Sequence, residues 1–247
     1  MTKKTWEAFT AAREHYRKII KALNRNLPEL QSFQQVLVDM RPGPAYRVET
    51  PILYNLALDE VIQKDEIRLI LIADNPGRRE QMAENRRYLV GPSGKIAEKF
   101  FREHPEMDID FRKNVLILNK TPVHTPRTAE LRELFRLGGP AVTEAIAASQ
   151  QAMAELLLEF HRILAPAPVW ITGYSEMRKG GIFETYTVAL KKLYAARPAL
   201  RKSLLLYRHF SMNQFTIDLR QKALPGEMPG RSLERIGKAY RERILGW

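Results

Sequence analysis

The chain lacks cysteine altogether, and it also lacks any long uncharged apolar run. The first absence excludes disulfides, cysteine-ligated zinc, iron–sulfur clusters and thiol nucleophiles. The second excludes a conventional membrane-spanning helix, which needs about 18 uncharged apolar residues, so we expect no membrane partner. The first twenty residues place charges among their apolar positions, unlike a signal peptide. We expect a cytoplasmic protein, associated with the nucleoid in a prokaryote or the nucleus otherwise.

Acidic residues are scarce relative to basic ones. Lysine and arginine number 40 and aspartate and glutamate 28, which gives a net charge of +12 across 247 residues. Between Glu184 and Asp218 there is no acidic residue, and that interval holds half of the net charge in Lys191, Lys192, Arg197, Arg201, Lys202 and Arg208. Such an excess indicates a polyanionic partner, and nucleic acid is the leading candidate. Solvated helix faces are the simpler explanation.

The apolar pattern predicts alternating strands and helices. Short apolar runs, typical of strands buried on both faces, lie at residues 67–73, 115–118, 169–172 and 203–207. Helical spacing predicts helices at about 93–104, 128–137, 141–164, 183–196 and 231–245, after two amphipathic helices before residue 41. The apolar fraction of 45% can supply one large core. We therefore expect one domain over 1–247, with a helical extension (1–50), a core (67–215) and a basic C-terminal segment (216–247).

Strands that alternate with helices predict an α/β fold, here a three-layer α/β/α sandwich around a mainly parallel four-stranded sheet. Ligands of such sheets bind beyond the carboxyl ends of the strands. Each predicted strand is followed by polar residues: Asp74-Asn75 after the first, Asn119-Lys120 after the second, Gly173-Tyr174-Ser175 after the third and Arg208-His209 after the fourth. These turns are therefore the candidate site.

In order, these motifs resemble the uracil-DNA glycosylase superfamily. Asn75-Pro76-Gly77 is similar to its first motif, and residues 87–94 (RYLVGPSG) to the segment that follows. Asn119 lies where the family has its base-reading asparagine, residues 120–128 are similar to its next loop, and His209-Phe210-Ser211 matches His-Pro-Ser. Phe210 replaces the usual proline, and branches with an iron–sulfur cluster are excluded. The resemblance covers about residues 67–215.

The resemblance implies a monofunctional, metal-independent DNA N-glycosylase that removes uracil or a related deaminated base flipped out of single- or double-stranded DNA. Asn75 and His209 are the expected catalytic residues. Asn75 has no titratable group, so it can orient water but cannot be a strong base. His209 can donate a hydrogen bond to the departing base, and the Asn119 amide matches O4 and N3–H of uracil but not cytosine. The expected substrate-binding residues are Asp74, Pro76, Gly77, Tyr88, Leu89, Asn119 and Ser211.

Further residues are candidates for DNA contact. Ser93 is expected to cap the helix that starts there, whose N-terminus can hold a phosphate. Met212 with Asn213 can form a wedge into the duplex. The expected DNA-binding set is Ser93, Lys95, Arg127, Lys179, Arg208, Met212 and Asn213. No spacing of histidine and carboxylates suggests a metal site, so we expect no metal and no other cofactor. We also expect a monomer.

Simpler interpretations remain for every residue named. Asn75 can stabilise a turn, Asn119 can cap a strand end, and His209 can be structural. Tyr88 and Leu89 can stack on a base or pack in the core, and Met212 can be core filler. Two other classes of function also remain open: a catalytically silent nucleic-acid-binding protein of the same fold, and a hydrolase of small nucleotides. A Walker A phosphate loop is excluded, because it would need glycine at Leu89.

Overall fold

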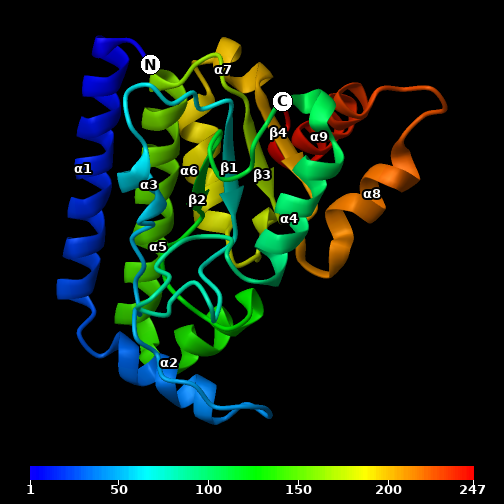
Figure 1. The fold of residues 1–247 in the computed structure, drawn as a ribbon. Coiled ribbons are helices and arrows are strands. Elements are labelled where there is room, and N and C mark those ends of the chain that lie inside the picture. Colours follow the sequence, from blue (N-terminus) through cyan, green and yellow to red (C-terminus); the bar gives the residue numbers. More distant parts are fainter.

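A computed structural model describes residues 1–247, and it forms an α/β protein with an N-terminal helix (Figure 1). None of its helices combines the length and the apolar composition needed to span a membrane. The elements in chain order are α1 (Lys3–Asn26), α2 (Leu30–Asp39), α3 (Ala57–Glu60), β1 (Leu69–Ala73), α4 (Pro92–Glu103), β2 (Val115–Asn119), α5 (Leu131–Ile163), β3 (Val169–Thr172), α6 (Glu184–Tyr194), α7 (Pro198–Lys202), β4 (Leu204–Tyr207), α8 (Gln214–Lys222) and α9 (Pro229–Leu245).

The four strands form a single sheet in the order β2-β1-β3-β4, and every pair is parallel. The expected strands are confirmed to within two residues at each end. The register sets Ala73 beside Asn119 and Thr172 beside Tyr207. All four carboxyl ends therefore reach the same edge of the sheet, which we call the carboxyl edge.

Helices pack on both faces of the sheet, because the strands are apolar on both. On one face, Trp170 of β3 stacks on Phe101 of α4 at 5.7 Å and on Phe215 of α8 at 5.9 Å. Also on this face, the Tyr207 hydroxyl donates to the Leu233 carbonyl of α9. On the other face, α5 packs against β2 and against α1 and α6.

The N-terminal helix α1 follows its apolar spacing. Phe9, Ala12, Tyr16, Ile20 and Leu23 recur every three to four residues and are buried. The Phe9 ring lies 5.4 Å from Phe160 of α5, and the Thr2 hydroxyl accepts a hydrogen bond from the Thr5 N–H at the start of the helix. The extension is therefore part of the same packed core.

Two differences from the predicted helices have local causes. The helices expected at 128–137 and 141–164 form one element, α5, which is broken at Gly139. Gly139 has a φ of 63°, a left-handed conformation that glycine adopts without strain, and Pro140 restarts the helix. The sequence did not predict α8, whose nine residues bury only Phe215, Asp218 and Leu219.

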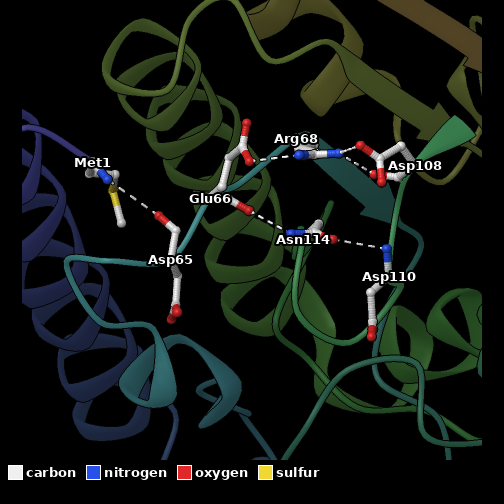
Figure 2. A network of polar contacts seen from close by, with 7 residues as sticks. All are labelled: Met1, Asp65, Glu66, Arg68, Asp108, Asp110 and Asn114. Carbon is white, nitrogen blue, oxygen red and sulfur yellow. Dashed lines mark hydrogen bonds and ion pairs between the residues drawn. The ribbon is translucent and has the colours of Figure 1, made fainter.

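Opposite the carboxyl edge, polar contacts close the amino ends of β1 and β2 (Figure 2). Arg68 pairs with both Glu66 and Asp108, and Asn114 donates to the Glu66 carbonyl at 2.9 Å. The Asn114 side-chain oxygen in turn accepts from the Asp110 N–H. Most polar groups drawn here have protein partners, which is typical of a structural edge.

Candidate active site at the carboxyl edge of the sheet

Asn75 leaves β1 with its side chain fixed by the loop after β2. Its Nδ2 donates to the Thr125 hydroxyl at 2.8 Å and to the Val123 carbonyl at 3.2 Å. Because a carbonyl oxygen only accepts, these contacts assign the nitrogen of the amide and leave Oδ1 without a protein partner. Asn75 is only half-buried, so Oδ1 can accept a hydrogen bond from a water molecule.

Pro76 and Gly77 hold this turn in place. Both nitrogens of the buried His124 ring have protein partners. Nδ1 lies 2.8 Å from the Pro76 carbonyl oxygen, and Nε2 lies 3.0 Å from the Tyr46 hydroxyl. Burial lowers the pKa of His124 to about 4, so the ring is neutral and donates from Nδ1 to Pro76. The Gly77 N–H donates to the Glu80 carboxylate at 3.1 Å.

Asn119 ends β2, and its amide is buried without any hydrogen-bond partner. The residue is 1% exposed, and neither Nδ2 nor Oδ1 has a partner within the protein. Buried polar groups are nearly always paired, and leaving one unpaired costs about 1–3 kcal/mol. No other amide in the chain has both side-chain atoms in this state. The amide is therefore available to read a ligand.

His209 follows β4 in a tight loop anchored by its neighbour. Phe210, which stands in place of proline, is fully buried and stacks on Phe215 at 4.4 Å. The Ser211 N–H donates to His209 Nδ1 at 3.0 Å. A neutral imidazole with Nδ1 as acceptor carries its proton on Nε2, so Nε2–H is the free donor. Burial lowers the pKa of His209, with a smaller lowering from Lys120 and an opposing effect of Asp74.

A hollow of about 320 Å³ opens beside His209. Its lining comes from the loops after β3 and β4: Gly173, Tyr174, Ser175, Arg208, His209, Ser211 and Gln214. Asn75 and Asn119 do not line this hollow. They lie on the β1 and β2 side of the same edge, with Asp74 and Lys120 between the two parts.

Sequence reasoning assigned no role to Lys120, although it directly follows Asn119. Its side chain is fully buried, and Nζ lies 2.5 Å from Asp74 Oδ1. The available signal was a lysine at the end of an apolar strand, where burial is unusual for that residue.

Tyr88 and Leu89 point away from the carboxyl edge. Tyr88 is 1% exposed, and its hydroxyl lies 2.5 Å from the Tyr16 hydroxyl and 2.7 Å from the Leu53 carbonyl. Leu89 is buried, and its N–H donates to Glu80 at 3.0 Å. In this conformation neither side chain can stack on a base.

Glu80 joins the first motif to this segment, because it accepts from both the Gly77 and the Leu89 N–H. Burial raises the pKa of Glu80 to about 7, against the lowering effect of these two hydrogen bonds. No motif in the sequence indicates this role of Glu80.

The candidate DNA-contacting residues lie around the carboxyl edge. Ser93 is the second residue of α4 and Gly91 is its N-cap, so the expectation that Ser93 caps this helix was wrong. Lys95, Arg127 and Lys179 are exposed and have no ion-pair partner. Arg208 donates to Gln214 at 2.7 Å.

Met212 and Asn213 form the tip of the His209 loop. Both have left-handed backbones, with φ of 53° and 58°. Met212 is 83% exposed, the highest value among the exposed large apolar side chains. This placement disagrees with a role as core filler.

Most basic residues of the acid-free interval lie away from this edge. Lys191 and Lys192 lie in the last turn of α6, and Arg201 and Lys202 lie in α7, which directly precedes the amino end of β4. In Figure 1, α7 and α2 lie at opposite ends of the molecule. Of the interval's basic residues, Arg208 belongs to the carboxyl edge.

No protein-family model matches the chain, and no curated protein matches it either. No group of three or more histidine or carboxylate side chains is placed to hold a metal ion.

Proposed function

We propose that the protein is a DNA N-glycosylase with a uracil-DNA glycosylase-like three-layer fold, acting on uracil or a related deaminated base flipped out of DNA. The observation that carries the proposal is the buried, unpartnered amide of Asn119. A base that presents one donor and one acceptor satisfies both of its atoms. Uracil offers O4 and N3–H in this arrangement, and cytosine reverses it, so the amide selects uracil when its Nδ2 faces O4 and its Oδ1 faces N3–H.

Asn75 supports the water-positioning role. Its Nδ2 is held by Thr125 and Val123, so its free Oδ1 is fixed in direction. A carboxamide oxygen accepts a hydrogen bond from water and orients the attack on C1′, and it contributes by positioning rather than by proton abstraction.

His209 supports the departure of the base. Its Nε2–H is set by the Ser211 contact at Nδ1, and the ring is uncharged at neutral pH because burial lowers its pKa. A fixed donor aimed at a developing anion is worth a few kcal/mol in the transition state. The negative charge on a pyrimidine O2 grows only as the glycosidic bond breaks, so this contact favours catalysis over ground-state binding.

Charge around the carboxyl edge supports a polyanionic substrate. Six exposed basic side chains in the loops after β1, β2 and β3 have no ion-pair partner, and we call them the basic rim: Arg78, Arg79, Arg86, Arg127, Arg178 and Lys179. In the loops after the four strands, Glu84 is the only exposed acidic residue. Phosphates that approach this edge therefore meet far more exposed positive than exposed negative charge.

The exposed Met212 supports base flipping. An apolar side chain on a rigid, left-handed turn beside His209 can fill the space that a flipped base leaves. Because the Asn119 amide has no solvent contact, the base reaches it only when the loops over this edge open. Unstacking a base costs a few kcal/mol, which phosphate contacts and the wedge offset.

The test is base release from oligonucleotides that carry uracil, hypoxanthine, xanthine or thymine. The proposal is supported if the protein releases at least one of these bases and if Asn119→Ala, Asn75→Ala and His209→Ala each abolish that release. The exposed Gln63, whose carbonyl accepts a hydrogen bond from the Met1 amine in the segment before β1, provides the control variant Gln63→Ala. Tight DNA binding without release from any substrate would favour the silent binding protein. Competition by free nucleotide would favour a small-nucleotide hydrolase.

The basic rim predicts where the salt dependence of binding originates. Neutralising Arg78, Arg79 and Arg86 to glutamine should reduce the slope of log affinity against log salt by roughly 2–3 units. The matched control neutralises Lys191, Arg201 and Lys202 at the opposite end of the sheet and should leave the slope unchanged. If the control flattens the slope and the rim variant does not, the assignment of the DNA-binding face is wrong.

A further inference from the structure

The turn that carries Asn75 is held by the loop that follows β2. The Val123 carbonyl and the Thr125 hydroxyl of this loop accept hydrogen bonds from Asn75 Nδ2. In the other direction, the Thr125 N–H and His124 Nδ1 donate to the Pro76 carbonyl at 3.3 Å and 2.8 Å. A carbonyl oxygen has two lone pairs, and these two donors use both. The direction of the Asn75 side chain therefore depends on where this loop lies.

The chain before β1 fixes the loop in turn. Ile52 and Val123 form an antiparallel bridge, and the His124 N–H donates to the Pro51 carbonyl at 3.0 Å. Gln34 of α2 is buried, and its Nε2 donates to the Pro51 carbonyl at 2.9 Å and to the His124 carbonyl at 2.7 Å. One amide therefore joins both sides of this pairing and connects α2 to the loop.

Tyr46 completes the contacts of the His124 ring. Its hydroxyl lies 3.0 Å from His124 Nε2. Because Nδ1 carries the proton that faces the Pro76 carbonyl, Nε2 of the neutral ring accepts from the tyrosine hydroxyl. The Tyr46 ring also lies 4.7 Å from the guanidinium of Arg78, a member of the basic rim. A chain of hydrogen bonds therefore runs from Tyr46 through His124 to the turn that carries Asn75.

We propose that the three side chains that fix this loop are positioning residues for Asn75: Gln34, Tyr46 and His124. This rests on the proposed role of Asn75 in orienting the attacking water. The three side chains bond to the loop or to the Pro76 carbonyl, and the loop holds Nδ2 so that the free Oδ1 keeps its direction. A displacement of about 1 Å at such a group can cost about 100-fold in rate. These side chains therefore act on bond cleavage and not on DNA affinity.

The first test replaces His124 with residues that remove or keep its bond to Pro76. Phenylalanine retains a planar ring but has no donor, whereas the asparagine Nδ2 lies close to the place of the histidine Nδ1. His124→Phe should lower single-turnover uracil release about 100-fold and leave DNA affinity unchanged. His124→Asn should retain most of the rate, because the donor to the Pro76 carbonyl is kept.

His161 provides the matched control for the loss of a buried histidine. It is 1% exposed, and its two nitrogens lie 2.9 Å from the Tyr194 hydroxyl and 3.0 Å from the Ser203 hydroxyl, next to the amino end of β4. His161→Phe should reduce the unfolding free energy as His124→Phe does but keep the wild-type rate. An equal loss of rate in both variants would show that stability alone sets the rate, which would overturn the proposal.

Two milder variants test the other positioning residues. Tyr46→Phe removes one hydroxyl and keeps the aromatic ring, and Gln34→Met removes the two donated hydrogen bonds and keeps the length of the side chain. Both should lower the rate in the same direction as His124→Phe, but by less. Tyr54→Phe removes a hydroxyl that donates to Asp59 at 2.7 Å, and this control should leave the rate unchanged.

Hydrogen exchange of the Asn75 side-chain amide, followed by NMR, gives a readout that needs no activity. In the wild type Nδ2 donates to both Val123 and Thr125, so its protons should exchange slowly. His124→Phe should speed this exchange several-fold, and His124→Asn should not. If the wild type releases no base, the proposed function fails, and the exchange measurement still decides whether the loop is fixed by these side chains.

Two further results would overturn the proposal. The first is wild-type exchange of the Asn75 amide in His124→Phe, verified as folded by far-ultraviolet circular dichroism. If His124→Phe does not fold, wild-type exchange in both Tyr46→Phe and Gln34→Met is decisive in the same way. The second is a rate for His124→Asn as low as that for His124→Phe, because the bond to the Pro76 carbonyl would then have no effect on the reaction.

Discussion

Replacing Asn119 with leucine should make the protein more stable and less active. Leucine has the same branching and nearly the same size as asparagine, so it creates no large cavity. It removes a donor and an acceptor that are both buried without partners. A destabilising amide retained at a candidate site is expected when the group is used by a ligand rather than by the fold.

The magnitude follows from the number of unpaired atoms. Each costs about 1–3 kcal/mol, so a net gain in unfolding free energy of about 2 kcal/mol is expected after some strain from the larger methyl groups. For a domain of this size that corresponds to a rise in Tm of roughly 4–8 °C. Loss of two hydrogen bonds to the base, at about 1.4 kcal/mol each, lowers kcat/KM for uracil about 100-fold.

Asn55 provides the matched control, because it is equally buried but fully bonded. Its Nδ2 donates to the Ile117 carbonyl at 2.9 Å, and its Oδ1 accepts from the Ala57 and Tyr88 N–H groups. Asn55→Leu should lower the unfolding free energy by about 3 kcal/mol. Urea unfolding of both variants gives the comparison. If Asn119→Leu is as destabilising as Asn55→Leu, or retains wild-type uracil release, the reasoning about the unpaired amide is wrong.

Three other perturbations have defined outcomes. His209→Ala should abolish the acidic limb of the rate–pH profile; in the wild type the rate should be level above neutrality and fall as pH drops through a His209 pKa below 6.5, as single-turnover rates can verify. Asn75→Asp should lose activity, not gain it, because its second oxygen would face the Val123 carbonyl; retained base release would contradict this. Glu80 has its pKa raised from 4.5 to about 7, so it contributes stability below pH 4.5 that is lost as pH rises through 7. Unfolding free energies of wild type and Glu80→Gln, measured from pH 4.5 to 8, should diverge in slope over that window, and parallel curves would refute the assignment.

Most of the sheet could be predicted from the sequence, because its strands are buried on both faces. Runs such as residues 69–73 and 115–118 are continuously apolar, and runs of this length are typical of strands that are covered on both faces. The order of the strands came from the structure, since four similar apolar runs carry no information about their neighbours. The short helix α8 was missed because three buried residues in nine give too weak a periodicity.

The sequence could predict which residues lie at the candidate site, because they directly follow the ends of predicted strands. Asn75, Asn119 and His209 each lie within two residues of a carboxyl end, and in a parallel sheet these ends share an edge. The direction of a loop side chain does not follow from such an argument. Tyr88 lies in the expected segment, but the left-handed backbone of the following residue, Leu89, belongs to a turn that directs the tyrosine toward α1.

The longest basic run of the sequence does not coincide with the basic rim, for a related reason. The interval 185–217 leaves the carboxyl edge along α6, reaches the amino ends of the strands at α7 and returns to the carboxyl edge along β4, so most of its basic residues lie away from that edge. The unpaired cations at the carboxyl edge come from three separate loops, each with only one to three of them. They become a rim only through the fold, which no window of sequence can reveal.

The two edges of the sheet differ in how their polar groups are satisfied. At the amino edge, the side chains of Arg68 and Asn114 have partners that fix β1 and β2. At the carboxyl edge, Asn75 keeps a free oxygen, His209 a free Nε2–H, and Asn119 an entire free amide. A buried unpaired group lowers stability, so the free amide of Asn119 is a stability cost without a structural benefit. A ligand that pairs with this amide recovers that free energy on binding, which is why the carboxyl edge is the best place to look for chemistry.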